Sequence, residues 1–254
     1  MNTEIDTNLI FNSCCLRSFI GLRLFIGMTA LLAAAAAGPG SAQSLRAIPV
    51  SNHIESRGPA DQAVLDEINA ARADPRAYAQ SLRDDLSHFR GAVLEAPGRS
   101  PLMTVEGPSA VEEAIADLER RPPAPPLRPD SAIAQAALRL VADEGPSGRV
   151  GHVASDGATL RQRLEAAGVW AMAMEEDIAY GPTEPREVVR ELIVDDGVPD
   201  RGHRAAIFDP AMSRAGSACG PHTTWRWVCV IDFAGGVARP PGSKVRVADA
   251  GRGR

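Results

Sequence analysis

Residues 225–233 have the sequence Trp225-Arg226-Trp227-Val228-Cys229-Val230-Ile231-Asp232-Phe233. Its odd-numbered positions carry aromatic residues, Cys and Ile, whereas Arg and Asp stand at even-numbered positions. This two-residue repeat predicts a β-strand with one strongly apolar face. Trp225 and Trp227 could also form a surface on which a ligand stacks, but their alternation with Arg226 favours ordinary packing of the sheet.

The segment 214–219 is the expected hairpin partner of this strand. Gly220-Pro221 supplies a turn signal between the two, so Cys219 and Cys229 can face each other across the hairpin. A disulfide that closes so short a ring stabilises a protein by roughly 2 to 3 kcal/mol. The alternative is a metal pair completed by His222, although three neighbouring groups on one hairpin seldom surround a metal ion.

Helical patterns fill the chain upstream of the hairpin. Apolar residues recur at helical spacing over residues 60–71, after Asp130 and after Thr183-Glu184-Pro185. Asp74-Pro75 starts a second helix directly after the first, because Asp caps a helix and Pro suits its first position. Thr159 and Gln162 form a capping box for a short helix that Gly168 ends. The helix after Asp130 is expected to end before Gly145-Pro146.

A Pro- and Gly-rich stretch separates these helical segments at about residues 83–126. Its pattern is weakly helical and ends in Arg121-Pro122-Pro123-Ala124-Pro125-Pro126. We interpret this stretch as an insertion or extended connector within one domain.

The N-terminal stretch has the features of a secretory leader. Arg17 and Arg23 precede an apolar run from Leu24 to Ala37, and Gly40-Ser41-Ala42 supplies the small residues of a cleavage site. The sequence therefore predicts a signal peptide over 1–42, a linker over 43–59, one domain over 60–236 and a disordered tail over 237–254. The alternative for the leader is a retained N-terminal anchor. Export to the periplasm or the cell exterior would place Cys219 and Cys229 in an oxidising compartment.

The overall composition is that of a globular protein with one core. The 254 residues are 44% hydrophobic and 23% charged, and the formal net charge of −5 is unchanged when the leader is removed. Mild acidity argues against a nucleic-acid partner, which would call for a basic stripe. No segment after the leader has the roughly 18 to 20 apolar residues of a membrane span.

Three short segments place ionisable side chains close to Gly. They carry His152, Glu176 and His203, which lie far apart in the chain. Two imidazoles and a carboxylate that converge can bind a divalent metal and leave positions open for water. The alternative is that each His caps a loop or satisfies a buried carbonyl group.

Five segments stand in a distinctive order along the chain. They are 64–75, 151–157, 176–181, 201–208 and 228–234. In this order they resemble the bacterial branch of the CAP superfamily, which includes cysteine-rich secretory proteins, insect venom antigens and plant pathogenesis-related proteins. The resemblance covers Asp61 to Gly236. It implies an α/β fold, a three-layer α-β-α sandwich with a disulfide-linked C-terminal hairpin.

The resemblance also implies a wide cleft in which two His and two Glu hold zinc or another divalent cation. His152, Glu176 and His203 match three members of that set. Asp177 stands where the family usually has Asn, which adds an acidic group beside Glu176.

The fourth ligand has several candidates. The family places its second Glu on the helix before the last His, where this chain offers Glu187 and Glu191. Asp195 and Asp196 follow that helix, in a segment that replaces the shorter Trp-containing link of many members, and are further candidates. The alternative for this acidic pair is a solvated turn before Gly197.

Three functions are compatible with this resemblance. The first is a secreted, non-enzymatic binding module whose cleft holds a divalent metal and a small lipidic or peptidic ligand. The second is a structural or cell-wall interaction protein, in which the cleft residues brace loops. The third is a metal-assisted hydrolase with His152 and His203 as ligands and Glu176 as general base for a bound water. The chain lacks the His-Glu-x-x-His arrangement of a peptidase, and Ser155 lacks the Gly-x-Ser-x-Gly setting of a hydrolase nucleophile.

Overall fold

The computed structural model describes residues 59–238. The predicted signal peptide, the linker up to residue 58 and the tail beyond residue 238 lie outside these residues. In the described part of the chain, no helix combines the length and the hydrophobicity that crossing a membrane requires.

A four-stranded sheet forms the centre of the domain, with the strand order β4-β6-β7-β5. Strand β7 (Arg226–Gly235) is antiparallel to both β5 (Ala173–Tyr180) and β6 (Arg214–His222), and the short β4 (Arg128–Pro129) runs parallel to β6. The predicted hairpin is β6–β7, but its turn lies at residues 223–225, and Gly220-Pro221, the predicted turn, belongs to β6. Cys219 lies directly opposite Cys229 in its register, and the two form the predicted disulfide.

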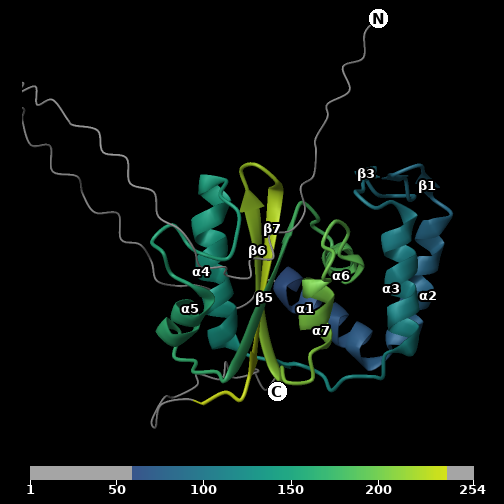
Figure 1. Cartoon of the computed structure of the whole chain (residues 1–254). Coiled ribbons are helices and arrows are strands. Elements are labelled where there is room, and N and C mark those ends of the chain that lie inside the picture. The colour runs from purple at the N-terminus through teal and green to yellow at the C-terminus, as the bar shows by residue number, and fades with distance from the viewer. Residues whose placement is uncertain (1–58, 239–254) are drawn as a thin grey trace, which may run out of the picture. The chain divides into compact units, whose positions relative to one another are not determined.

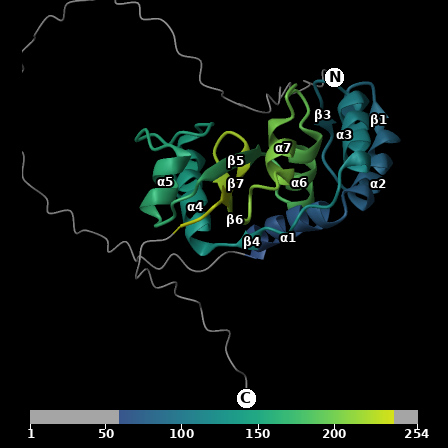
Figure 2. The same cartoon turned by 60° about the horizontal axis from the view of Figure 1, so that its bottom comes forward.

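Helices cover both faces of this sheet, as Figures 1 and 2 show. On one face lie α4 (Ser131–Ser147) and α5 (Leu160–Ala166). On the other face lie α1 (Pro59–Ala73), α6 (Pro185–Val194) and α7 (Gly202–Phe208). The predicted three-layer α-β-α sandwich is confirmed.

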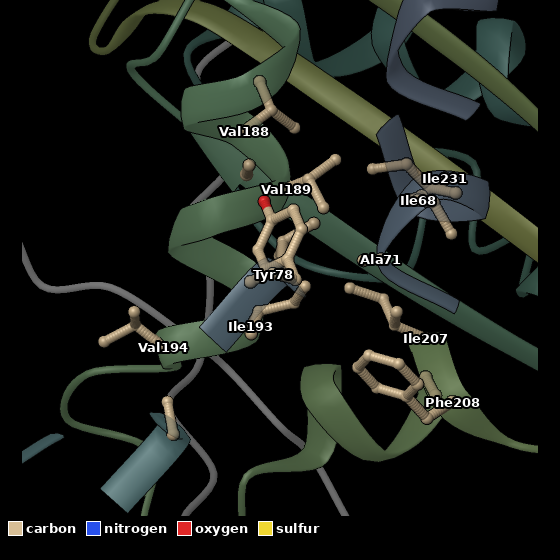
Figure 3. Packing of buried hydrophobic residues seen from close by; sticks show 14 of the residues in the cluster. Ile68, Ala71, Tyr78, Val188, Val189, Ile193, Val194, Ile207, Phe208 and Ile231 are labelled. Atoms are coloured by element: carbon tan, nitrogen blue, oxygen red, sulfur yellow. The ribbon is translucent and has the colours of Figure 1, made fainter. Parts of the chain in front are cut away.

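The alternation of β7 divides the core into two parts. Cys229, Ile231 and Phe233 pack towards α1, α6 and α7, whereas Val228 and Val230 pack towards α4. Figure 3 shows the first part, where Ile68 of α1 and Ile231 of β7 meet side chains of α6 and α7. Burial of both strand faces against helices explains why even the residues between the large apolar ones are mostly Val.

Helix α4 packs unusually close to the sheet because β6 carries Gly at the crossing point. A Cβ atom on Gly216 would lie only 2.1 Å from the backbone nitrogen of Ala134. Any larger residue at position 216 would therefore push α4 away from the sheet.

Three of the predicted helix starts are confirmed by their caps. Asp74 accepts a hydrogen bond from the amide of Ala77 before α2 (Pro75–Leu86), and Asp130 caps α4. Thr159 and Gln162 form the expected capping box of α5. The predicted end of α4 is wrong, since the helix continues through Pro146 to Ser147. A proline in the last turn removes one hydrogen bond without stopping the helix, and Gly148 ends it in the left-handed conformation.

The stretch at 83–126 is more ordered than a weakly helical connector. It contains a small sheet of β1 (Phe89–Arg90), β2 (Val93–Leu94) and β3 (Leu102–Met103). The 13-residue helix α3 (Pro108–Arg120) follows and packs between α2 and α6. We call residues 87–107 the small-sheet segment.

Candidate functional site

The loop that carries His152 is held by hydrogen bonds to its backbone. The amide of Gly151 donates to the hydroxyl oxygen of Tyr180 on β5, at 2.9 Å. The same hydroxyl donates to Oε2 of Glu144 on α4, at 2.8 Å. Burial raises the pKa of Glu144 to about 7, although the hydrogen bond from Tyr180 lowers it. The loop is therefore connected to a buried acidic group.

A second imidazole fixes the beginning of the same loop. Nδ1 of His222 accepts hydrogen bonds from the amides of Thr224 and Trp225, so its ring hydrogen lies on Nε2. Nε2 donates to the carbonyl oxygen of Arg149 at 2.8 Å. His222 is therefore a structural residue of the hairpin and the loop, not part of a metal pair with the cysteines.

His152 itself binds Glu176. Its Nδ1 atom lies 2.8 Å from Oε1 of Glu176, and because a carboxylate only accepts hydrogen bonds, Nδ1 is the donor. The side chain of Glu176 is 3% exposed and that of His152 is 28% exposed. A carboxylate therefore orients a partly exposed imidazole, an arrangement that suits contact with a ligand or transfer of a proton.

The other oxygen of Glu176 is bound by Arg163. The guanidinium donates from Nη2 to Oε2 of Glu176, and the arginine side chain is completely buried. Its Nη1 donates to the carbonyl oxygen of His152 at 3.0 Å. The carboxylate of Glu176 thus lies between an imidazole and a buried guanidinium.

Asp232 adds a second acid at this place. It lies directly opposite Glu176 in the pairing of β5 with β7 and is completely buried. Burial, together with the neighbouring charge of Glu176, raises the pKa of Asp232 well above its ordinary value. Two acidic side chains thus lie side by side in the interior, and neither carboxyl oxygen of Asp232 has a hydrogen-bond partner among the described residues. We call His152, Arg163, Glu176 and Asp232 the guanidinium cluster.

His203 binds a different carboxylate. Its Nδ1 lies 2.6 Å from Oδ1 of Asp195, and its backbone amide donates to Oδ2 at 3.0 Å. Both residues are buried. Burial lowers the pKa of His203, but the hydrogen bond to Asp195 and the charge of Asp177 outweigh this and raise it to about 9. His203 is therefore an imidazolium ion at neutral pH.

The two imidazole–carboxylate pairs lie on opposite sides of the sheet. Successive residues of a strand point to opposite faces. Glu176 shares a face with Ile178, which packs in the cluster under α4. Asp177 shares a face with Ala179, which packs in the cluster of α1, α6 and α7. The structure thus brings His152 to Glu176, and places His203 with Asp195 beyond the sheet.

This arrangement does not fit one metal ion shared by His152, Glu176 and His203. Both oxygens of Glu176 are engaged, and Nδ1 of His203 is bound to Asp195. Within residues 59–238, no three His, Cys, Asp or Glu side chains form a group that could hold a metal ion. Only a binding measurement can test whether these residues hold a metal ion, so the predicted metal site stays a prediction.

The candidates for a fourth ligand have other contacts. Glu187 forms ion pairs with Arg99 and Arg190, both at 2.9 Å. The same two arginines also bind Asp85, so that two acids and two arginines form one network between α2, α6 and the small-sheet segment. Glu187 therefore joins the insertion to the sandwich.

The acidic pair after α6 is not a solvated turn. Asp195 ends α6 in the left-handed conformation, with φ 58°, and binds His203. Asp196 accepts hydrogen bonds from the amides of Val105 and Glu106, at 2.6 and 2.8 Å. One residue of the pair therefore faces the core and the other fixes the small-sheet segment.

A pocket lies between the small-sheet segment and α6. Its lining is mainly apolar, with Arg190, Glu191 and Asp196 as its charged members. The apolar lining comes from Phe89, Leu94, Leu102, Met103, Val111 and Val194. Glu191, a candidate fourth ligand, is thus part of this pocket. Its charge also helps to raise the pKa of His203, so Glu191 lies near the His203–Asp195 pair as well.

Sequence reasoning missed Arg163, Asp232, Glu144 and Tyr180. Asp232 stands in a strongly apolar strand, and a charged residue within such a strand is a signal of a buried polar site. Arg163 gives no comparable signal, because an Arg on a short helix is usually exposed.

Comparisons with known proteins agree with this fold. The sequence model of the family described as "CAP: Cysteine-rich secretory protein family" matches residues 65–231. The chain therefore belongs to the cysteine-rich secretory protein family. It has no significant match among curated proteins.

Among solved structures, the chain is similar to an outer surface protein from Borrelia burgdorferi, with 18% identity and a TM-score of 0.38 over 52% of this chain and 96% of that one. It is similar to an extracellular protein containing an SCP domain from Bacillus anthracis, with 17% identity and a TM-score of 0.38 over 48% of this chain and 39% of that one. A cysteine-rich secretory protein from Staphylococcus aureus matches with 13% identity and a TM-score of 0.35, over 61% and 48% of the two chains. The alignments thus span less than half the length of the latter two proteins.

Proposed function

We propose that this chain is an exported, non-enzymatic binding module that holds a small lipidic or peptidic ligand in the pocket between the small-sheet segment and α6. The observation that carries the proposal is the apolar lining of that pocket, with charged residues at Arg190, Glu191 and Asp196. A small-molecule site usually combines an apolar wall with a few polar groups that point towards the ligand.

The ion-pair network fixes the charged side chains of the pocket. Arg190 lines the pocket and is held by Asp85 and Glu187, while Asp196 is held by two backbone amides of the small-sheet segment. Side chains that are fixed before binding lose little conformational entropy when a ligand arrives. The enclosed space is only about 30 Å³, so the apolar wall has to open to admit a lipid or a peptide, while the charged groups are already in place.

Export is the second part of the proposal. It is supported by the leader-like sequence before Gln43 and by the disulfide between Cys219 and Cys229, which suits an oxidising compartment.

Binding of a neutral apolar dye, N-phenyl-1-naphthylamine, tests the pocket. The wild-type chain should bind the dye saturably, and Leu102→Glu should weaken binding at least tenfold, because it places a charge on the apolar wall. Met172→Glu is the matched control, since Met172 is 89% exposed and does not line the pocket. Equal dye binding by wild type and Leu102→Glu would contradict the proposal. Displacement by fatty acids or by short apolar peptides then distinguishes the two ligand classes.

A second candidate is a structural or cell-wall interaction role, in which the polar residues only brace loops. The observation that favours it is that Glu176 and Asp195 each tie a histidine to another element. Under this role, His152→Ala and Glu176→Ala lower the melting temperature, and no variant of the pocket changes any ligand response. A dye response that depends on Leu102 excludes a purely structural role.

A further inference from the structure

Arg163 occupies a position in the interior that few arginines have. Its side chain is completely buried on α5, below the loop of His152. Besides Glu176, its guanidinium binds the carbonyl oxygens of His152 at 3.0 Å and Ala158 at 3.4 Å. The cation therefore joins the loop 152–158 to the carboxylate of β5.

Two acids would otherwise share this space with little compensation. Glu176 is 3% exposed and Asp232 is completely buried, and the two are direct partners across β5 and β7. Buried acids need a positive partner, because water cannot solvate their charge. A divalent metal held by Glu176 and His152 would be one such partner. The guanidinium is another, and it is permanently charged and part of the chain.

We propose that Arg163 is the built-in cation of this site and takes the place of a divalent metal ion beside Glu176 and His152. A metal and the guanidinium compete for the same carboxylate oxygen, since Oε2 of Glu176 already accepts from Arg163. Removal of the guanidinium then leaves the imidazole of His152 and the carboxylate of Glu176 beside a vacated volume. These are two ligand types that zinc accepts. This inference is independent of the apolar pocket and goes beyond the proposed function.

Zinc titration by isothermal calorimetry at pH 7 tests the inference, with chain that has been dialysed against a chelator. Arg163→Ala should bind one zinc ion at least tenfold more tightly than the wild type, and adding Glu176→Gln should remove the gain. Arg163→Lys is the matched control, because it keeps the positive charge and should show no gain. The wild type and Glu176→Gln should bind zinc equally weakly.

Two results would overturn the inference. One is stoichiometric zinc binding by the wild type that is lost in Glu176→Gln or His152→Ala, because the metal and Arg163 would then coexist. The other is a folded Arg163→Ala chain with no gain in zinc affinity. If Arg163→Ala is unfolded without metal, zinc should restore its native circular dichroism spectrum, and failure to do so counts against the inference. The dye-binding test of the pocket is unaffected by either result.

Discussion

The two histidine–carboxylate pairs on either side of β5 differ in the source of their positive charge. At Glu176, the buried guanidinium of Arg163 supplies it. At Asp195, the imidazole of His203 carries the positive charge, with a pKa of about 9. Two pairs of the same kind, each a histidine with a carboxylate, thus differ in which group carries the positive charge.

The largest expected effect is the loss of the guanidinium. Arg163→Met should lower the free energy of unfolding by about 3 to 5 kcal/mol, because a buried carboxylate loses its cation. Urea denaturation at pH 7 measures the change. The matched control is Arg139→Met, whose ion pair with Asp156 is exposed and whose loss should change stability far less. If the two variants lost similar amounts of unfolding free energy, burial would not explain the effect of Arg163→Met.

The second prediction concerns alkaline pH and the other pair. The pKa of His203 rises from 6.5 to about 9 in the folded chain. Its contribution to stability is therefore complete below pH 6.5 and is lost as the pH rises through about 9, by up to about 3 kcal/mol. Urea denaturation at pH 6 and pH 10 measures this loss. The loss should be absent in His203→Gln and retained in His152→Gln. Parallel curves of stability against pH for the wild type and His203→Gln would refute the prediction.

The smallest effect is expected at Glu144, an acid near the guanidinium cluster that has no cation of its own. Its pKa rises from 4.5 to about 7, so the stability it contributes is complete below pH 4.5 and is lost as the pH rises through about 7. Glu144→Gln keeps an acceptor for Tyr180 and should be more stable than the wild type at pH 8 by roughly 1 to 2 kcal/mol.

The control for Glu144 is Glu112→Gln on the exposed side of α3, which should stay within about 0.5 kcal/mol of the wild type. Thermal unfolding at pH 5 and pH 8 compares the variants. A Glu144→Gln chain that is less stable than the wild type at pH 8 would contradict this prediction, because the carboxylate would then be favourable at that pH.

The sequence predicted the features that depend on local patterns. The alternation over residues 225–233 indicated β7, Cys219 and Cys229 indicated the disulfide, and Thr159 with Gln162 indicated the cap of α5. Strands of two residues have no period to detect, so the small-sheet segment was not predicted. The end of α4 was misplaced because Gly and Pro break helices only on average.

By itself, the sequence determined which segments are helices and strands, which family the chain resembles and which cysteines pair. Only the tertiary structure decided which charged groups meet. Glu176 and Asp177 are neighbours in the chain, yet the pleat of β5 sends them to opposite faces, one towards Arg163 and the other towards His203. Hydrophobic periodicity is a local property of the chain, whereas the partner of a buried charge is set by which elements pack against each other.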